Sequence, residues 1–306
     1  MQTSARIILA AYNITPSDIV PLTGGLETDV WRVIAIEGTY TARRFCTSDQ
    51  QLSSLSSELV WLDALSAHAV PVPRPVRLRD GTLAPVMETD VDGLAVAMWT
   101  LLEWVEGAPL GRLPTPDEAR KVGKLTATMH NVARHWAPPE KFMRPRYDTT
   151  LFRTAADTLF ANLGNALAHS DLALLEDAIV RSCAVLDQLW SEGRDIGVIH
   201  ADLHDGNVLW SEDAPQPWAI DFGRCGTAPL ALDVAMAQHY LTPELAEDLL
   251  DGYLAAMLAP PLDASSLASL RYLAAVENFA VLSRFPEEIE NIVRDVPFLT
   301  SQACAV

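Results

Sequence analysis

The stretch Val198–Leu209, together with residues 219–223, contains the side chains in this chain that are best suited to chemistry. The first segment reads VIHADLHDGNVL and the second reads AIDFG. Asp202 could accept a proton from a substrate hydroxyl, and Asn207 and Asp221 could hold a metal ion that bridges the phosphates of a nucleotide. Two carboxylates and one amide at these spacings predict phosphoryl transfer from a magnesium nucleotide.

Three short apolar runs are expected to position these side chains. Val198–Ile199 predicts a buried strand that leads into the loop. Val208–Trp210 and Trp218–Ile220 predict two further strands that form a hairpin. Such a hairpin would bring Asn207 and Asp221 close together. Because Mg²⁺ prefers oxygen ligands and usually takes one or two carboxylates from a protein, one Asp and one Asn suit it.

The first hundred residues predict strands with one helix. A hairpin is expected from Val30–Ile36 and Thr39–Phe45, which are rich in β-forming residues and flank a Glu-Gly turn signal. Ser48–Gln51 is typical of a capping box that opens a helix. A second hairpin is expected with Asp80–Gly81 at its turn and Ala95–Leu102 as its last strand.

The rest of the chain predicts mostly helices. Thr115–Glu118 has the pattern of a helix start, with a proline in the first turn. Long helical stretches are predicted over residues 149–192, 243–258 and 264–282. A strand-rich part followed by a helix-rich part predicts two lobes, residues 1–103 and residues 104–306, with a small-molecule site in a cleft between them.

Composition and charge exclude several classes of protein. The chain has 306 residues, of which 49% are hydrophobic and 20% charged, so a globular protein with a large core is expected. No apolar run reaches the ~18 residues of a membrane span, and no signal-peptide pattern opens the chain, which predicts a cytoplasmic protein. A net charge of −18 argues against binding to nucleic acid or an anionic membrane. It permits a cationic small-molecule substrate, although solubilising surface charge is the simpler explanation.

The motif of His200, Asp202 and Asn207 with the downstream Asp221-Phe-Gly resembles that of the aminoglycoside phosphotransferase and choline kinase family of small-molecule kinases. The resemblance covers nearly the whole chain. It implies an α+β, bilobal, protein-kinase-like fold, with an antiparallel-sheet N-lobe containing one main helix and a mostly helical C-lobe. It also implies an enzyme that uses ATP and Mg²⁺ to phosphorylate a hydroxyl of a small molecule, which would be aminoglycoside-, choline- or homoserine-like.

The resemblance assigns a role to each matching residue. Asp202 would be the catalytic base or would orient the hydroxyl, and Asn207 and Asp221 would bind Mg²⁺. Arg43 would contact the α- and β-phosphates and pair with Glu58.

Further matching segments concern the nucleotide base and the catalytic loop. Residues 102–107 are similar to the hinge whose backbone reads adenine, with Glu103 and Val105 as the implied contacts. His200 would support the loop, and Asp233 resembles an aspartate found shortly beyond the metal ligand.

Two features depart from the family pattern. The expected phosphate loop has only two glycines, Gly24 and Gly25, and no G-x-G-x-x-G, although backbone amides in a turn can still bind phosphate. The basic strand residue is arginine where many kinases have lysine, and Arg44 competes with Arg43 for the role. Because neighbours on a strand face opposite sides, only one of them can point into the cleft, and the family pattern favours Arg43. No GxxxxGK[ST] occurs, which excludes a P-loop kinase.

Two other functions remain open from the residues alone. His200, Asp202 and His204 alternate, so on an extended strand they could share one face and ligate zinc in a metal-dependent hydrolase. A catalytically weak, nucleotide-binding pseudokinase would fit the glycine-poor loop. In a kinase, acceptor contacts are expected from helical residues between about 136 and 192 and after 240. Acidic side chains such as Asp233, Glu277 and Glu287 could meet a cation or could be solvated surface.

Overall fold

The computed structural model describes residues 2–22, 28–46, 49–89, 95–163, 167–193, 195–257, 264–304 and 306. The chain forms two compact units, each of which draws on several segments. Unit 1 consists of Met1–Pro109, Ala137–Arg144 and Val208–Gly223. Unit 2 consists of Leu110–Trp136, Pro145–Asn207 and Arg224–Val306. The lobes predicted as residues 1–103 and 104–306 remain a prediction.

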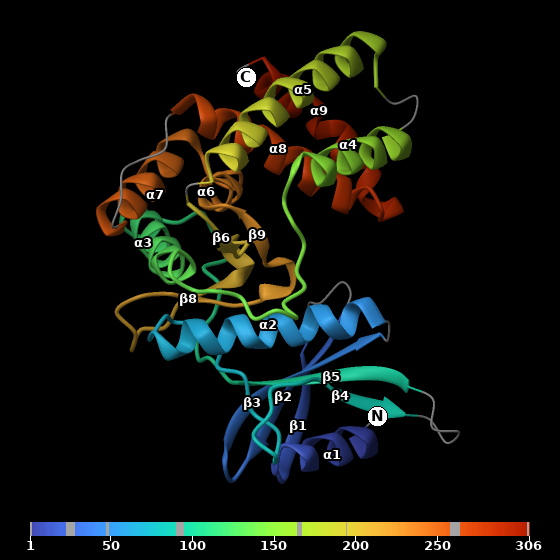
Figure 1. Ribbon diagram of the computed structural model, residues 1–306, viewed down its shortest axis with the longest axis vertical. Coiled ribbons are helices and arrows are strands. Elements are labelled where there is room, and N and C mark those ends of the chain that lie inside the picture. Colours follow the sequence, from blue (N-terminus) through green and yellow to red (C-terminus); the bar gives the residue numbers. More distant parts are fainter. Residues whose placement is uncertain are drawn as a thin grey trace. The chain divides into compact units, whose positions relative to one another are not determined.

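Unit 1 is built on a five-stranded antiparallel sheet with the strand order β1-β2-β3-β5-β4 (Figure 1). Its strands are β1 (Pro16–Leu22), β2 (Asp29–Ala35), β3 (Gly38–Cys46), β4 (Val86–Thr89) and β5 (Ala95–Glu103). The predicted hairpin of β2 and β3 is confirmed, with Ala35 paired to Gly38 at the turn. The prediction that Asp80–Gly81 turns the second hairpin is wrong. Among the described residues, no strand leads directly into this pair: β4, the partner of β5, begins only at Val86. The pair closes a tight local turn in which the N–H of Leu78 donates to the carbonyl of Thr82.

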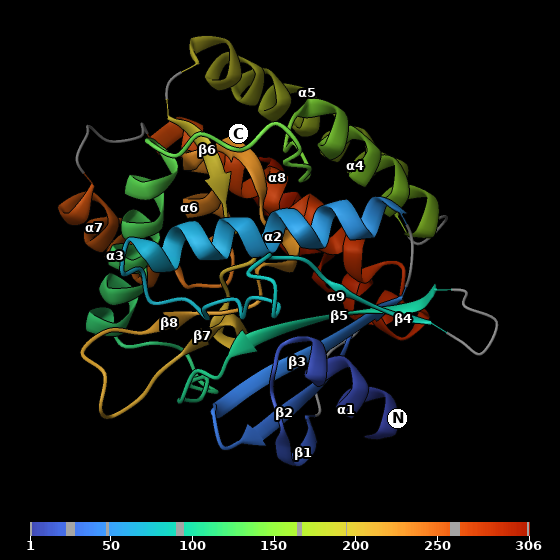
Figure 2. The same cartoon turned by 60° about the horizontal axis from the view of Figure 1, so that its bottom comes forward.

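One helix covers each face of this sheet, as Figure 1 and Figure 2 both show. Helix α1 (Gln2–Ala11), which the sequence did not predict, packs its apolar side chains against the face that carries Val33, Ala42 and Trp99. Helix α2 (Asp49–Ala67) carries Glu58, which pairs with the residue next to Ala42 and so lies on the opposite face. The predicted cap at Ser48 lies outside the described residues.

The predicted hairpin after the loop is also present and belongs to unit 1. Strand β7 (Val208–Leu209) pairs antiparallel with β8 (Trp218–Ala219). The hairpin begins directly after Asn207 and ends two residues before Asp221. The N–H of Ala219 donates to the carbonyl of Pro71, which ties the hairpin to the rest of its unit.

Unit 2 is mostly helical. Its helices are α3 (Pro116–Ala133), α4 (Thr149–Leu163), α5 (His169–Glu192), α6 (Leu230–Gln238), α7 (Pro243–Ala256), α8 (Ala264–Leu282) and α9 (Ile289–Ala303). The capping box predicted at Thr115–Glu118 is confirmed. The stretch predicted as helical over 149–192 is two helices, because the chain is extended at Ala168 before α5 begins. Both α4 and α5 pack against α8 (Figure 2). None of the described helices combines the length and apolarity needed to span a membrane.

Short elements complete the fold. Strand β6 (Ile196–Ile199), predicted from Val198–Ile199, pairs antiparallel with β9 (Gly226–Pro229). The 3-10 helices within the described residues are η2 (Asp205–Asn207), η3 (Phe222–Arg224) and η4 (Pro286–Glu288).

A buried carboxylate in unit 2 holds the chain where it leaves β6. Asp233 on α6 accepts hydrogen bonds from the N–H groups of His200 at 2.9 Å and Ala201 at 2.8 Å, and it lies 2.9 Å from Nε2 of His130 on α3. Burial would raise the pKa of Asp233, but the contacts with His130 and His200 hold it below its usual value. Ala201 has a φ of 63°, which costs a residue with a Cβ roughly 1–2 kcal/mol. The network offsets this cost and sets the direction in which Asp202 leaves the strand.

We expect Asp233→Asn to lower the free energy of unfolding by roughly 3 kcal/mol in urea titrations, because the carboxamide cannot accept from both backbone N–H groups and His130 as the carboxylate does. The folded pKa of Asp233 is lowered, so its stabilisation is present above the unfolded value near 4 and is lost as the pH falls below it. The difference from wild type should therefore shrink from pH 6 to pH 3. The exposed Asp251→Asn on α7 is the control, and equal stability of the Asp233 variant and wild type would contradict the role of this network.

Candidate functional site

The loop that carries Asp202 closes on itself through Asn207. The amide Nδ2 of Asn207 donates to the carbonyl of Asp202 at 2.8 Å and lies 3.2 Å from its Oδ2. Because Nδ2 makes these contacts, Oδ1 of Asn207 is the atom left to ligate a cation. The N–H of Asp202 donates to Nδ1 of His200 at 3.2 Å, so His200 supports the loop from within the core. The side chain of Asp202 is 18% exposed, which leaves it open to a ligand.

An arginine that the sequence analysis missed connects Asp202 to a second carboxylate. Nη1 of Arg224 lies 3.1 Å from Oδ1 of Asp202, and Nη2 pairs closely with Oε2 of Glu277 on α8. Burial and the charge of Asp202 raise the pKa of Glu277, although Arg224 acts in the opposite direction. A charged residue in the otherwise apolar stretch of α8 around Glu277 was the signal available in the sequence. Two carboxylates therefore share one guanidinium at this site.

Aromatic side chains lie beside this group of charges. The ring of Tyr240 meets that of His204 edge-on, with centroids 5.4 Å apart, and its hydroxyl donates to Oδ1 of Asn278 at 3.2 Å. Burial lowers the pKa of His239, whose ring also contacts Tyr240, to about 4. His239 is thus neutral at neutral pH and adds no positive charge here.

In unit 1, the strand alternation separates Arg43 from Arg44. Arg43 forms an ion pair with Glu58 at 2.8 Å, with the two side chains 9% and 0% exposed, and its Nε donates to Oγ1 of Thr100. Arg44 instead pairs with Glu88 at 2.9 Å and is 28% exposed. Within the described part of unit 1, Nη2 of Arg43 and Oε2 of Glu58 are buried without a hydrogen bond. Buried groups of this kind favour a polar partner.

The sheet face that carries Arg43 also offers apolar surface. Val30 lies opposite Arg43 and Leu22 lies opposite Val30, and Leu22 is 38% exposed.

At the end of β5, the N–H groups of Glu103 and Trp104 already donate to the carbonyls of Arg74 and Thr39. Val105, which follows Trp104 and is the second predicted hinge contact, is buried. Gly24 and Gly25 lie outside the described residues.

Asp221 lies in a tight turn in unit 1. Its φ is 59°, its side chain is exposed, and its Oδ1 accepts from the N–H of Gly223 at 3.3 Å. A Cβ at position 223 would lie 3.1 Å from that oxygen, so a glycine leaves room around the carboxylate. The exposed carboxylate is suited to bind a cation.

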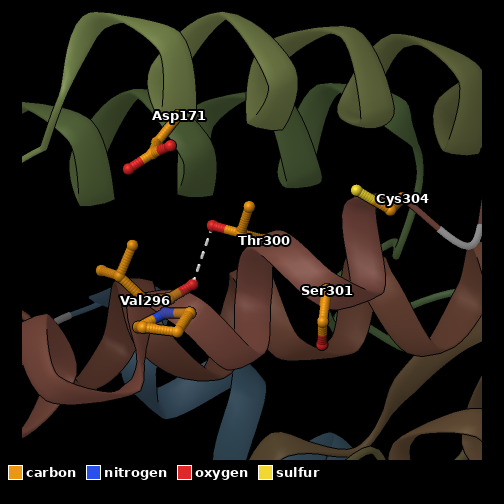
Figure 3. A pocket seen from close by; sticks show the side chains of 6 residues that line it. Asp171, Val296, Thr300, Ser301 and Cys304 are labelled. Atoms are coloured by element: carbon orange, nitrogen blue, oxygen red, sulfur yellow. Dashed lines mark hydrogen bonds between the residues drawn. The ribbon is translucent and has the colours of Figure 1, made fainter.

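The zinc-hydrolase interpretation finds no support in the structure. Among the described residues, no group of three His, Cys, Asp or Glu side chains is placed to hold a metal ion. A separate hollow in unit 2 lies between α5 and α9 and is lined by Asp171, Val296, Pro297, Thr300, Ser301 and Cys304 (Figure 3). The hydroxyl of Thr300 donates a hydrogen bond to the carbonyl of Val296 in its own helix. This hollow gathers no set of groups comparable to those around Asp202.

Solved structures share the fold of this chain. The microcompartment-associated aminopropanol kinase has a TM-score of 0.77 at 24% identity, over 99% of this chain and 95% of that one. Amicoumacin kinase hAmiN, in complex with AMP-PNP, Ca²⁺ and Ami, has a TM-score of 0.73 at 16% identity, over 98% and 93%. Choline kinase from Cryptosporidium parvum Iowa II has a TM-score of 0.67 at 12% identity, over 97% and 95%. These likenesses confirm the predicted protein-kinase-like α+β fold.

Curated relatives are similar in sequence over part of their length. Homoserine kinase of Zymomonas mobilis subsp. mobilis is 27% identical over 203 residues, which are 62% of this chain and 57% of that protein. Homoserine kinase of Brucella anthropi is 31% identical over 180 residues, 56% of this chain and 48% of that protein. The chain thus spans about half the length of the curated relatives it matches. The sequence profile of the phosphotransferase enzyme family matches residues 18–268, most of the chain. The chain belongs to this phosphotransferase enzyme family.

Proposed function

We propose that the protein transfers the γ-phosphoryl group of ATP, with Mg²⁺, to the hydroxyl of a small molecule that carries a cationic amine. The proposal is carried by the structure of one loop. In this loop, Nδ2 of Asn207 contacts both the backbone carbonyl and the partly exposed carboxylate of Asp202. Membership of the phosphotransferase family supports it independently.

The nucleotide would be bound by residues of unit 1. Arg43, paired with Glu58, has an unused buried Nη2 for the phosphates. The carbonyl of Glu103 and the N–H of Val105 would read adenine, and the amides of Gly24 and Gly25 would line the phosphates. The relative that was solved with AMP-PNP and Ca²⁺ is consistent with a nucleotide and a divalent cation.

Asn207 and Asp221 would hold Mg²⁺, and their amide and carboxylate oxygens are the donors this ion prefers. When bound, Mg²⁺ neutralises charge on the phosphates. Asp202 accepts the hydrogen bond of the acceptor hydroxyl and takes its proton as the oxygen attacks. Catalysis comes mainly from holding the reacting groups in line.

The acceptor class follows from the charges around Asp202. Arg224 donates to Oδ1 of Asp202 and to Oε2 of Glu277. One guanidinium leaves the two carboxylates with a net negative charge, which a protonated amine would balance. The ring of Tyr240 adds a surface on which an organic cation can rest. A hydroxyl-bearing amine is therefore the proposed acceptor, as homoserine and aminopropanol are for the relatives named after them.

The proposal is tested by measuring ADP release over a panel of homoserine, aminopropanols, choline, aminoglycosides and amine-free sugars. We expect turnover that requires both Mg²⁺ and an amine-bearing alcohol. Nucleotide binding without turnover on any acceptor would contradict the proposal and favour a pseudokinase. Turnover on amine-free alcohols alone would overturn the acceptor class.

We expect Asp202→Ala to lower kcat by about 10²- to 10⁴-fold, because the group that accepts the hydroxyl proton is removed, while the Kd for Mg·ADP measured by calorimetry is retained. Asp221→Ala should instead abolish the Mg²⁺-dependent part of ADP binding. The exposed Asp213→Ala serves as control. Wild-type turnover by the Asp202 variant would show that the assigned base is wrong.

Glu277→Gln keeps the size of the side chain but removes its charge. We expect it to raise KM for the amine-bearing acceptor about 10- to 100-fold, as expected for a lost charge-assisted contact, with KM for ATP unchanged. Glu247→Gln, which removes an exposed charge from α7, is the matched control. An unchanged acceptor KM in the Glu277 variant would exclude this carboxylate from acceptor binding.

A further inference from the structure

Arg144 joins two parts of unit 1 that are far apart in the sequence. Its Nη2 donates to the carbonyls of Gly223 at 2.6 Å and Phe222 at 3.2 Å, the two residues that follow Asp221. Its Nη1 donates to Oγ of Ser54 on α2 at 2.6 Å and lies 3.3 Å from the carbonyl of Ser54. One guanidinium thus holds the turn of Asp221 against helix α2.

The contact on α2 lies next to Glu58. Ser54 precedes Glu58 by four residues, so the two side chains share one face of the helix a single turn apart. The neighbouring N–H of Met143 donates to Oγ of Ser57 at 2.8 Å, which fixes the same segment to the helix at a second point. Met143 and Arg144, two adjacent residues of the 137–144 segment, therefore contact helix α2 within one turn of Glu58, the residue that pairs with Arg43.

We propose that Arg144 is a positioning residue that couples the carboxylate of Asp221 to the Arg43–Glu58 ion pair, so that the cation-binding and phosphate-binding groups of unit 1 are set together. The inference rests on the proposed function, because it assumes that these groups bind Mg·ATP. The planar fork of arginine matches this task, since it donates in two directions at once. A lysine ammonium at the same place is a single point of contact and cannot bridge the turn and the helix in this way.

The test compares Arg144→Ala, Arg144→Lys and Ser54→Ala with wild type. We expect both Arg144 variants to raise KM for Mg·ATP about 10- to 100-fold, the range found when groups that orient metal ligands are removed, with the acceptor KM unchanged. Ser54→Ala should act in the same direction but less strongly, and the double variant should be no worse than Arg144→Ala, because the two residues act as one unit. Arg146→Ala is the matched control, since Arg146 stacks on the ring of Trp190 in unit 2, 3.4 Å from its centroid.

A second measurement needs neither nucleotide nor metal. Amide hydrogen exchange of the free protein should speed up in residues 219–223 and in the first turns of α2 for both Arg144 variants, and not for Arg146→Ala. Folded Arg144 variants with wild-type KM for Mg·ATP and wild-type exchange would overturn the coupling; if Arg144→Ala does not fold, Arg144→Lys and Ser54→Ala decide in the same way. Absence of Mg·ATP binding in wild type would instead refute the proposed function, and the exchange data would still test the contact itself.

Discussion

The site in unit 2 depends on the buried carboxylate of Asp233. It accepts from two successive backbone N–H groups and contacts His130, so protein groups stabilise its charge. The same bonds hold Ala201 in a left-handed conformation that an alanine would not otherwise adopt. The direction of the next side chain, Asp202, follows from that conformation. The position of the proposed base is therefore set by a residue 31 positions further along the chain.

Three arginines, each paired with groups on another element, connect the remaining parts of the proposed site within their units. Arg43 is buried with Glu58 on the face of the sheet covered by α2, whereas its neighbour on β3 faces the other way. Arg224 bridges Asp202 and Glu277, and Arg144 bridges the turn after Asp221 and helix α2. A guanidinium can donate in several directions at once, which makes it suited to join elements that are distant in sequence.

Local patterns made much of this fold predictable. The β2–β3 hairpin and the capping box of α3 follow from alternation and from helix-start residues, and the spacing of Asp202 and Asn207 predicted that they belong to one loop. The break between α4 and α5 was not predicted, because the apolar periodicity indicated one continuous helix; the chain is extended at Ala168, directly before α5. Helix α1 was not predicted, because its sequence has no clear helix-start pattern. Its apolar residues Ile8 and Leu9 are buried only through their packing against the sheet.

Contacts over long sequence separations were not predictable in this way. Arg224 and Glu277 are 53 residues apart and Arg144 and Ser54 are 90 apart, so neither pair leaves a periodic or motif-like trace. The alternation of β3 predicted that Arg43 and Arg44 face opposite sides of the sheet, and the ion pair with Glu58 places Arg43 on the face covered by α2.

We propose that Asp202 directs a phosphoryl group from ATP to the hydroxyl of an amine-bearing molecule. The most direct measurement is phosphorus NMR of a reaction containing ATP, Mg²⁺ and homoserine or an aminopropanol. We expect a new phosphomonoester resonance that grows in step with ADP for the wild-type protein and is absent for Asp202→Asn, although that variant still binds Mg·ADP. Consumption of ATP that yields only inorganic phosphate, or a phosphomonoester formed at the wild-type rate by Asp202→Asn, would contradict it.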